Sequence, residues 1–530
     1  MRSTRALLLL AAVAASSALG ASASAAPGPD PVLPHYQVAA LPGTIGAAEP
    51  RNATAPDGRL YTMTNATDRS AVVLVSTDQG VTWTKTAGNP VNGASPTTDV
   101  DIVATRTGRL IGSELDFAGP GAITFVTSYS DDRGATWTRS TGQLPADTDR
   151  QWYAVGPDDP TTHQPRVYLL FHNLASGTVS HNMFVSTSTD NGATFGAPVP
   201  TTLPGDQAFA DLQCADSGGP SNIFVNQTTG QLYVVFGTRT STVAAAGGCA
   251  ASVSPGPFEV NVVNATRVWV ATSPTGSAGT WRQSLAVDRS EVGHIVGAQL
   301  SPGAVDRAGN VYVAFPESAN SSDFTSGINY VHAPADLSSW SAPVVVTPLA
   351  GAGNIVPDIV AGDAGRVAFS WWHGDDAVGT AAPLWYQHVG ESLDALVAAP
   401  HVSTARVSDI PVQAGTENVL LGACGTGPAA GVENGTICGR SSDVNGVGID
   451  PAGRLFMSWP AQVPKSSHAA TAANDKTYAA TAIDGPSLYA DPPPKALPEA
   501  PAAALVLLSG LAVLGAAVIG RHRRAGSRLA

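Results

Sequence analysis

Short apolar stretches with alternating polar positions follow one another along the chain, and a glycine turn precedes most of them. Because a period of two residues is typical of half-buried strands, each turn and the stretch behind it predict a β-hairpin. Six of the turn glycines are Gly58, Gly108, Gly230, Gly309, Gly365 and Gly453. The long interval between Gly108 and Gly230 contains a seventh hairpin, whose turn at 155–159 leads into the apolar stretch 167–171.

A second pattern, Ser-x-Asp-x-Gly-x-Thr followed by an aromatic residue, occurs where three of the apolar strands end, at 76–83, 130–137 and 188–195. We expect the carboxylate to accept N–H bonds across a turn, the glycine to take a positive φ, and the ring to pack against a neighbouring unit. The structural residues of these turns are then Asp78, Gly80, Trp83, Asp132, Gly134, Trp137, Asp190, Gly192 and Phe195.

The two patterns together predict the fold. Seven hairpins, each leading to an apolar strand and to such a turn or its remnant, indicate seven units of four strands. The prediction is an all-β, seven-bladed β-propeller with four-stranded blades, and a six-bladed propeller with one extra hairpin is the alternative.

The three complete turns resemble the Asp box of bacterial neuraminidase repeats, in the sialidase superfamily, and the run 149–152 resembles segments of secreted sialidase-like propellers from actinobacteria. That resemblance implies three arginines that hold a sialate carboxylate, a Tyr–Glu nucleophile and an Asp acid. Ala48 stands where the first arginine is expected, and Arg51 lies three residues later. Candidates for the other arginines and for the Tyr–Glu pair are Arg150, Arg239, Arg267, Tyr153 with Glu114, and Tyr330 with Glu317.

Both ends of the chain carry the marks of an exported, anchored protein. Residues 1–26 read as a signal peptide, and the propeller is expected at 40–484, followed by a Pro/Ala-rich linker at 485–501. The uncharged run 502–520 is long enough to span a bilayer, and the basic tail 521–530 is then cytoplasmic. A buried core helix is the alternative for that run. The stretch 497–501 resembles a cell-wall sorting signal but has Ala and Pro where Thr and Gly belong.

Net charge and cysteine content limit the classes of partner and bound group that the sequence predicts. The net charge of −13 excludes the basic surface that nucleic-acid binding needs, and we expect a monomer with no metal and no other cofactor. Four cysteines in an exported chain favour disulfides over a metal site, and the short separations favour the pairs Cys214–Cys249 and Cys424–Cys438.

Candidate ligand residues are the first residues of the innermost strands, which face the central channel of a propeller. They include Glu49, Arg51, Asp99, Asp101, Asp149, Arg150, Trp152, Asp211, Gln213 and Asp358. Asp99 and Asp101 share a strand face and could act as catalytic carboxylates or bind Ca²⁺. Arg150 could bind a carboxylate and Trp152 could stack on a sugar. Alternatively, Arg150 pairs with Asp149 or a neighbouring blade and Trp152 fills the core. For the candidate set as a whole, the alternative is that its members are Asp and Asn residues that cap turns at strand starts.

Two hypotheses of function follow. In the first, the propeller is a non-catalytic surface module that binds extracellular glycans or surface proteins at its channel. In the second, it is an exo-acting glycoside hydrolase of exo-α-sialidase type, with Asp99 or Asp101 as the acid. In both, the propeller is extracellular and is held at the membrane by the C-terminal helix.

Overall fold

The computed structural model describes residues 33–46, 48–90, 97, 99–119, 122–142, 148–173, 182–213, 220–239, 265–297, 301–319, 326–348, 353–374, 384–414, 444–461 and 476–491. Within these ranges, no helix is long and apolar enough to cross a membrane. The expected signal peptide, the 502–520 segment, the basic tail and all four cysteines lie outside the described residues.

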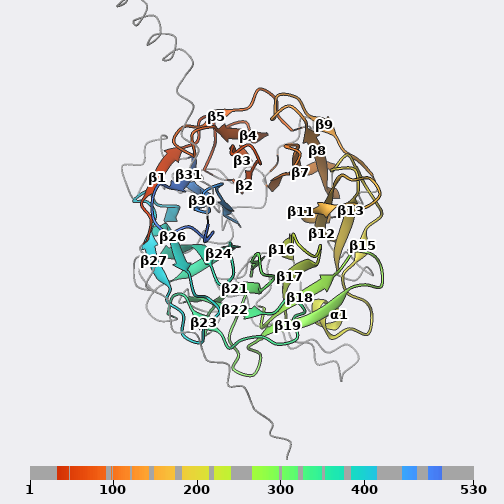
Figure 1. Ribbon diagram of the computed structural model, residues 1–530, viewed down its shortest axis with the longest axis vertical. Helices are drawn as coiled ribbons and strands as arrows, with labels where there is room; N and C mark the ends of the chain where they lie inside the picture. The colour runs from red at the N-terminus through yellow and green to blue at the C-terminus, as the bar shows by residue number, and fades with distance from the viewer. Residues whose placement is uncertain are drawn as a thin grey trace, which may run out of the picture.

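Seven antiparallel sheets of four strands surround a central axis, which confirms the seven-bladed prediction and rules out the six-bladed alternative (Figure 1). Blades 1 and 2 comprise β2 (Arg51–Thr54), β3 (Leu60–Asn65), β4 (Ala71–Ser76), β5 (Thr84–Lys85), and β6 (Val100–Ala104), β7 (Leu110–Gly119), β8 (Ala122–Ser130), β9 (Thr138–Arg139). Blades 3 and 4 comprise β11 (Thr148–Asp158), β12 (Pro165–Asn173), β13 (Met183–Ser188), β15 (Val199–Pro200), and β16 (Pro220–Val225), β17 (Leu232–Thr238), β18 (Arg267–Ser273), β19 (Arg282–Asp288).

Blades 5 and 6 comprise β20 (Gly303–Val305), β21 (Val311–Glu317), β22 (Gly327–Ala333), β23 (Val344–Val345), and β24 (Asn354–Ala361), β25 (Val367–Gly374), β26 (Leu384–Ser392), β27 (Ser403–Arg406). Blade 7 comprises β29 (Gly446–Ile449), β30 (Leu455–Ala461), β31 (Lys476–Ala482) and β1 (Tyr36–Ala40). The remaining elements are β10 (Thr141–Gly142), β14 (Thr194–Phe195), β28 (Gln413–Ala414) and the helix α1 (Gln207–Leu212).

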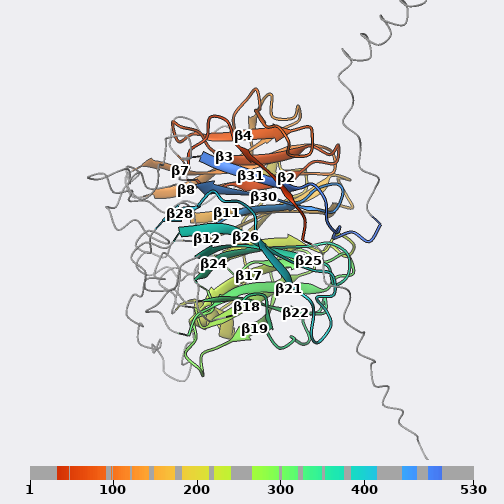
Figure 2. The ribbon, with the colours of Figure 1, turned by 90° about the vertical axis from the view of Figure 1, so that its left-hand side faces the viewer.

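The ring closes by pairing the two ends of the chain. The N-terminal strand β1 is the outermost strand of blade 7 and pairs with β31, so that Tyr36 lies opposite Ala482. Figure 2 shows β30 and β31 beside β3 of blade 1, the neighbouring blade. Because the last blade contains the first strand, the sheet edges are protected and the circle cannot open without breaking this ladder.

The hydrophobic core is divided among the blade interfaces. Seven clusters of buried apolar side chains each join two adjacent blades; one, for example, packs Leu74 and Trp83 of blade 1 against Phe456 of blade 7. Each large apolar side chain buried there contributes roughly 1.5–3 kcal/mol. Alternate strand residues face the two neighbouring blades, so the middle strands, such as β3 and β21, are buried along their whole length.

The Asp boxes form the turns that the pattern predicts. In blade 1, Asp78 accepts hydrogen bonds from the Thr82 backbone N–H (2.9 Å) and hydroxyl (2.5 Å), and the Ser76 hydroxyl accepts from the Gly80 N–H (2.7 Å). Blades 2 and 3 repeat these contacts around Asp132 and Asp190. All three glycines have positive φ, between 81° and 87°.

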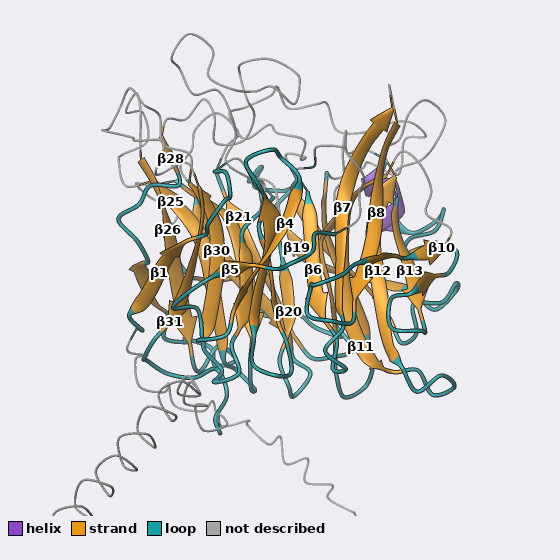
Figure 3. Ribbon diagram, turned by 90° about the horizontal axis from the view of Figure 1, so that it is seen from above, coloured by secondary structure: helices purple, strands orange, loops and turns teal. Residues whose placement is uncertain are grey.

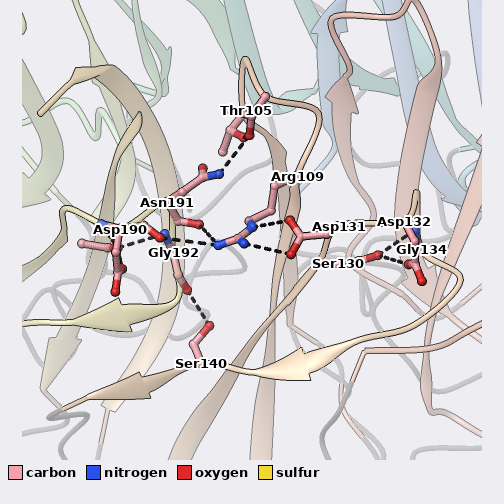
Figure 4. A network of polar contacts seen from close by, with 12 residues as sticks. Thr105, Arg109, Ser130, Asp131, Asp132, Gly134, Ser140, Asp190, Asn191 and Gly192 are labelled. Carbon is pink, nitrogen blue, oxygen red and sulfur yellow. Dashed lines mark hydrogen bonds and ion pairs between the residues drawn. The ribbon is translucent and has the colours of Figure 1, made fainter. Parts of the chain in front are cut away.

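Each box also touches the preceding blade. A Cβ on Gly192 would lie 2.4 Å from Ile111 Cδ1 of blade 2, and a Cβ on Gly134 would lie 2.9 Å from Thr86 Cγ2 of blade 1. Figure 4 shows the boxes of blades 2 and 3 joined through Arg109, which forms an ion pair with Asp131 (2.7 Å) and donates to the Asn191 carbonyl (3.1 Å). The boxes therefore also connect neighbouring blades.

Two later blades replace the box threonine with histidine. Asp394 accepts from the His401 backbone N–H (3.0 Å), and His401 Nδ1 lies 3.3 Å from the same carboxylate. Asp484 does the same with His35, at 2.6 and 2.7 Å, across the N- and C-terminal ends of the described chain. The sequence pattern misses both because the donor lies farther along the chain or at its other end.

The propeller has two distinct faces. The bottom face carries the hairpin turns at Gly58, Gly108, Gly230, Gly309, Gly365 and Gly453, and the top face is where the innermost strands begin (Figure 3).

A strap, residues 484–491, crosses the bottom face below blades 7, 6 and 5. Leu488 is buried, its N–H donates to the Gly453 carbonyl (2.7 Å), and its carbonyl accepts from the Asp363 N–H (2.8 Å). Residues 485–491, expected in the linker, thus pack on the propeller.

Candidate functional site

A cavity of about 460 Å³ occupies the central channel and is lined by the innermost strands of all seven blades. Each strand contributes a residue near its beginning: Arg51, Asp101, Trp152, Asn222, Gly303, Asp358 and Val447. The lining also includes the last residues of these strands, such as Thr54 and Ile449. The cavity therefore extends from the first residues of the inner strands toward the bottom face.

Arg51 presents the main cationic group of this cavity. Its guanidinium lies 4.1 Å from the centre of the Trp152 ring and its Nη1 lies 3.8 Å from Asp358 Oδ2, which is an ion pair without a hydrogen bond. Its Nε is buried and has no acceptor among the described residues. A guanidinium has five N–H donors, and buried donors are normally satisfied, so Arg51 is suited to bind oxygen atoms that enter the channel.

Two carboxyl groups flank Arg51 from blades 2 and 6. Asp101 accepts from the backbone N–H groups of Tyr153 (2.6 Å) and Ile102 (2.9 Å), and Asp358 accepts from that of Ile359 (2.8 Å). Burial raises the pKa of both carboxyls to about 6, although the positive charge of Arg51 opposes the shift. Both groups can thus change protonation near neutral pH.

Equivalent β-bulges place two of the lining residues. The pairing of β11 with β12 shifts register between Asp149 and Trp152, and that of β24 with β25 shifts between Ile355 and Asp358. Within these bulges Arg150 and Val356 have φ values of 56° and 52°, a conformation rare for residues other than glycine. Bulges and such strained residues are common beside functional sites, where they redirect side chains.

The indole ring of Trp152 packs against the Arg51 guanidinium. The indole is 2% exposed, its Nε1 donates to the Pro220 carbonyl (3.3 Å), and one ring face is covered by the Arg51 guanidinium. Stacking on a sugar would require Arg51 to move away. Trp152 is thus a buried residue in the wall of the channel.

Several other predicted residues lie outside the cavity. Glu49 and Asp99 form a backbone bridge at the top face, and both are buried. Arg150 is 3% exposed, and its backbone N–H donates to Asp149. Burial alone would raise the pKa of Asp149, but the His172 ring (Nε2 3.8 Å from Asp149 Oδ2) and the Arg150 charge hold that pKa well below its usual range.

Asp211 and Gln213 do not start an inner strand, because the inner strand of blade 4 begins at Pro220. Asp211 lies on α1, where it is buried and binds Arg267 Nη1 (3.1 Å) and Trp269 Nε1 (3.1 Å), and Gln213 caps that helix. Asn222 of blade 4 lines the cavity and was not among the residues predicted from the sequence. Its side-chain amide exchanges two hydrogen bonds with the Gly303 backbone (2.7 and 3.0 Å) and joins blades 4 and 5 at the channel.

The residues that the sialidase resemblance implies do not converge in the cavity. Arg267 forms an ion pair with Asp211 and Asp288, and neither it, Arg150 nor Arg239 lines the cavity. The Tyr330 hydroxyl is buried and donates to the Ala395 carbonyl (2.9 Å), and that of Tyr153 donates to the Gly112 carbonyl (3.3 Å). Neither tyrosine presents its hydroxyl with a glutamate partner in the cavity.

Comparison with known proteins gives a family. The model of the BNR repeat-like domain matches residues 59–333, more than half of the chain. No curated protein sequence matches.

Several solved structures match the chain at low sequence identity. An ulvan lyase bound to a GlcA–Rha3S ligand matches at 12% identity, with a TM-score of 0.48, over 79% of this chain and 92% of that one. The α-L-arabinofuranosidase of Fusarium graminearum, in complex with arabinobiose, matches at 11% identity and 0.41 over 87% and 98% of the two chains. A Hadza microbial sialidase matches at 11% and 0.40 over 81% and 75%. Similarities this distant carry no argument about chemistry.

Proposed function

The chain belongs to the family of BNR repeat-like domains, and on that premise we propose that its propeller is an extracellular module that binds a glycan in the central channel. The observation that carries the proposal is Arg51, whose guanidinium is held on Trp152 and whose buried Nε donates to no described residue. A volume of about 460 Å³ lies within the usual range of ligand pockets, roughly 300–1,000 Å³.

The arrangement suits sugar hydroxyls. A hydroxyl group both accepts and donates hydrogen bonds, so one sugar can accept from Arg51 while it donates to Asp101 or Asp358. Hydrogen bonds to charged groups are stronger than neutral ones and contribute about 1.5–3 kcal/mol each. A ligand with several adjacent hydroxyls can therefore use all three charged groups together.

Glycoside hydrolysis is the second candidate, and the two carboxyl groups favour it. A general acid works best when its pKa lies near the working pH, and burial raises the pKa of Asp101 and Asp358 to about 6. In this candidate, Asp101 donates the proton to the leaving oxygen and Asp358 is the second carboxylate.

The cell-surface location belongs to the same proposal. His35 and the strap place both ends of the described chain at the bottom face. If the 502–520 segment anchors the chain, the bottom face points toward the membrane and the top face points outward.

The test is a glycan array and a panel of fluorogenic glycosides, probed with the purified full chain. We expect glycan signals that Arg51→Gln removes and that the matched control Arg139→Gln, on exposed β9, keeps. An array without any Arg51-dependent signal would refute the proposal. Turnover of a glycoside that Asp101→Asn abolishes would establish the second candidate.

A further inference from the structure

We infer that the channel selects sugars with a neutral end and rejects sialate and uronate ends at neutral pH, an inference that rests on the glycan-binding function proposed above. Its basis is the charge balance of the cavity. Among the described lining residues, Arg51 is the one cation and Asp101 and Asp358 are the two acids. With both acids ionised, the channel carries a net charge of −1.

The surroundings add to this negative balance. The segments that flank Arg51 and Asp101 carry further acids: Glu49, Asp99, Glu114 and Asp116 are buried, and Asp149 is half-buried. The cation Arg150 and the imidazole of His172 lie among them. Tyr153 also lines the channel, and burial raises its pKa well above the usual value, so it stays neutral. None of these neighbours reverses the sign set by the two aspartates.

An anionic sugar end meets one guanidinium and two carboxylates in this space. Arg51 is already held near Asp358 (3.8 Å), so a ligand carboxylate would compete with that partner and would face repulsion from both acids. Like charges in a partly buried site repel strongly because the surrounding dielectric is low. A neutral sugar avoids this penalty and still bonds to all three groups.

The same balance makes the selection depend on pH. As pH falls below about 6, Asp101 and Asp358 take up protons and the net charge of the cavity changes from −1 toward +1. The rejection of anionic ends should therefore weaken at pH 5.

The experiment uses the full chain on an array that carries neutral, sialylated and uronate-ended glycans at pH 7.5 and pH 5. We expect the Arg51-dependent signals at pH 7.5 to be confined to neutral ends. Equal or stronger Arg51-dependent signals from anionic ends would overturn the inference and leave glycan binding intact. The absence of every Arg51-dependent signal would overturn both.

A charge variant gives the second arm. The double variant Asp101→Asn/Asp358→Asn keeps Arg51 but removes both acids, and a thermal melt verifies that it folds. Relative to neutral ends, its affinity for glucuronate-ended glycans at pH 7.5 should rise at least about tenfold, because two like charges are removed. The control Asp131→Asn removes an acid that pairs with Arg109 beside the Asp box of blade 2 and does not line the cavity. Its affinity for glucuronate-ended glycans should not rise. No gain in a folded double variant would also overturn the inference.

Discussion

The aspartates of the Asp boxes and those of the channel differ in the direction in which their surroundings shift the pKa of the carboxyl group. In the Asp box of blade 2, hydrogen bonds from the Thr136 hydroxyl and N–H lower the pKa of Asp132 to about 2. In the channel, burial raises the pKa of Asp101 and Asp358 to about 6, even with Arg51 nearby. A box supplies its carboxylate with local donors and leaves it near water, whereas the channel removes water and supplies few donors.

The comparison teaches where the fold gains stability and where it tolerates a cost. Ionised box carboxylates stabilise their turns, and the turns pack on the preceding blade. The channel holds two acids in a place that disfavours their charge, and such groups concentrate at functional sites.

The largest effect is expected at the box glycines. Gly192→Ala introduces a Cβ 2.4 Å from Ile111 Cδ1 at a φ of 81°, and overpacking and backbone strain should together lower the free energy of unfolding by about 3 kcal/mol. The control Gly108→Ala has a φ of 86° with nothing within 4 Å of the new Cβ, so about 1 kcal/mol is expected. Chemical denaturation measures both, and equal losses would show that the box does not depend on contact with blade 2.

The next effect concerns the channel acids and pH. With a folded pKa of about 6 against about 4 in the unfolded chain, Asp101 and Asp358 hold more protons in the folded state between these values. Stability should therefore fall as pH rises from 4 to 6, by up to about 2–3 kcal/mol for each group.

Asp358→Asn lacks the Asp358 part of this dependence and keeps that of Asp101. The variant should be more stable than the native chain at pH 7.5, with the difference vanishing near pH 4. Melting curves across this range decide the matter. A destabilised variant at pH 7.5 would mean that the Arg51 contact outweighs the cost of burial.

A smaller pH dependence of stability, opposite in direction to that of the channel acids, is expected at the Asp box of blade 3. Although burial alone would raise it, hydrogen bonds from Thr194 and Ser188 lower the pKa of Asp190. Its contribution should be present above about pH 4 and lost as pH falls through the folded pKa. Asp190→Asn should cost about 1 kcal/mol at pH 7, as for loss of a capping residue, and less in acid. A loss that is constant from pH 7 to pH 3 would assign the effect to packing instead.

The smallest effect is expected at the closure of the ring. Asp484→Ala removes the acceptor of His35, but both side chains are largely exposed and the β1–β31 ladder remains. Amide hydrogen exchange should become faster in β1 and stay unchanged in β3 and β4. Faster exchange throughout blade 1 would show that this contact holds the whole ring closed.

The sequence alone predicted the hairpin turns, the three Asp boxes and part of the residues that line the channel. The hairpin glycines and the Asp boxes are visible because their partners lie within a few residues, and Arg51, Asp101 and Asp358 were found by their positions at strand starts. Asp211 was misplaced because α1 is inserted before β16. Asn222 was missed because one amide among many polar residues gives no signal until blade 5 lies beside it.

The local pattern of this chain determined the seven units, the turns between them and the aromatic residues that pack between blades, because hydrogen bonds over a few residues and side-chain alternation are written in the order of residues. Tertiary structure decided which acids meet Arg51, that Trp152 packs against it, that β1 completes blade 7 and that the strap packs on the bottom face. These facts depend on bulges, ring closure and desolvation, which arise only when segments far apart in the chain come together.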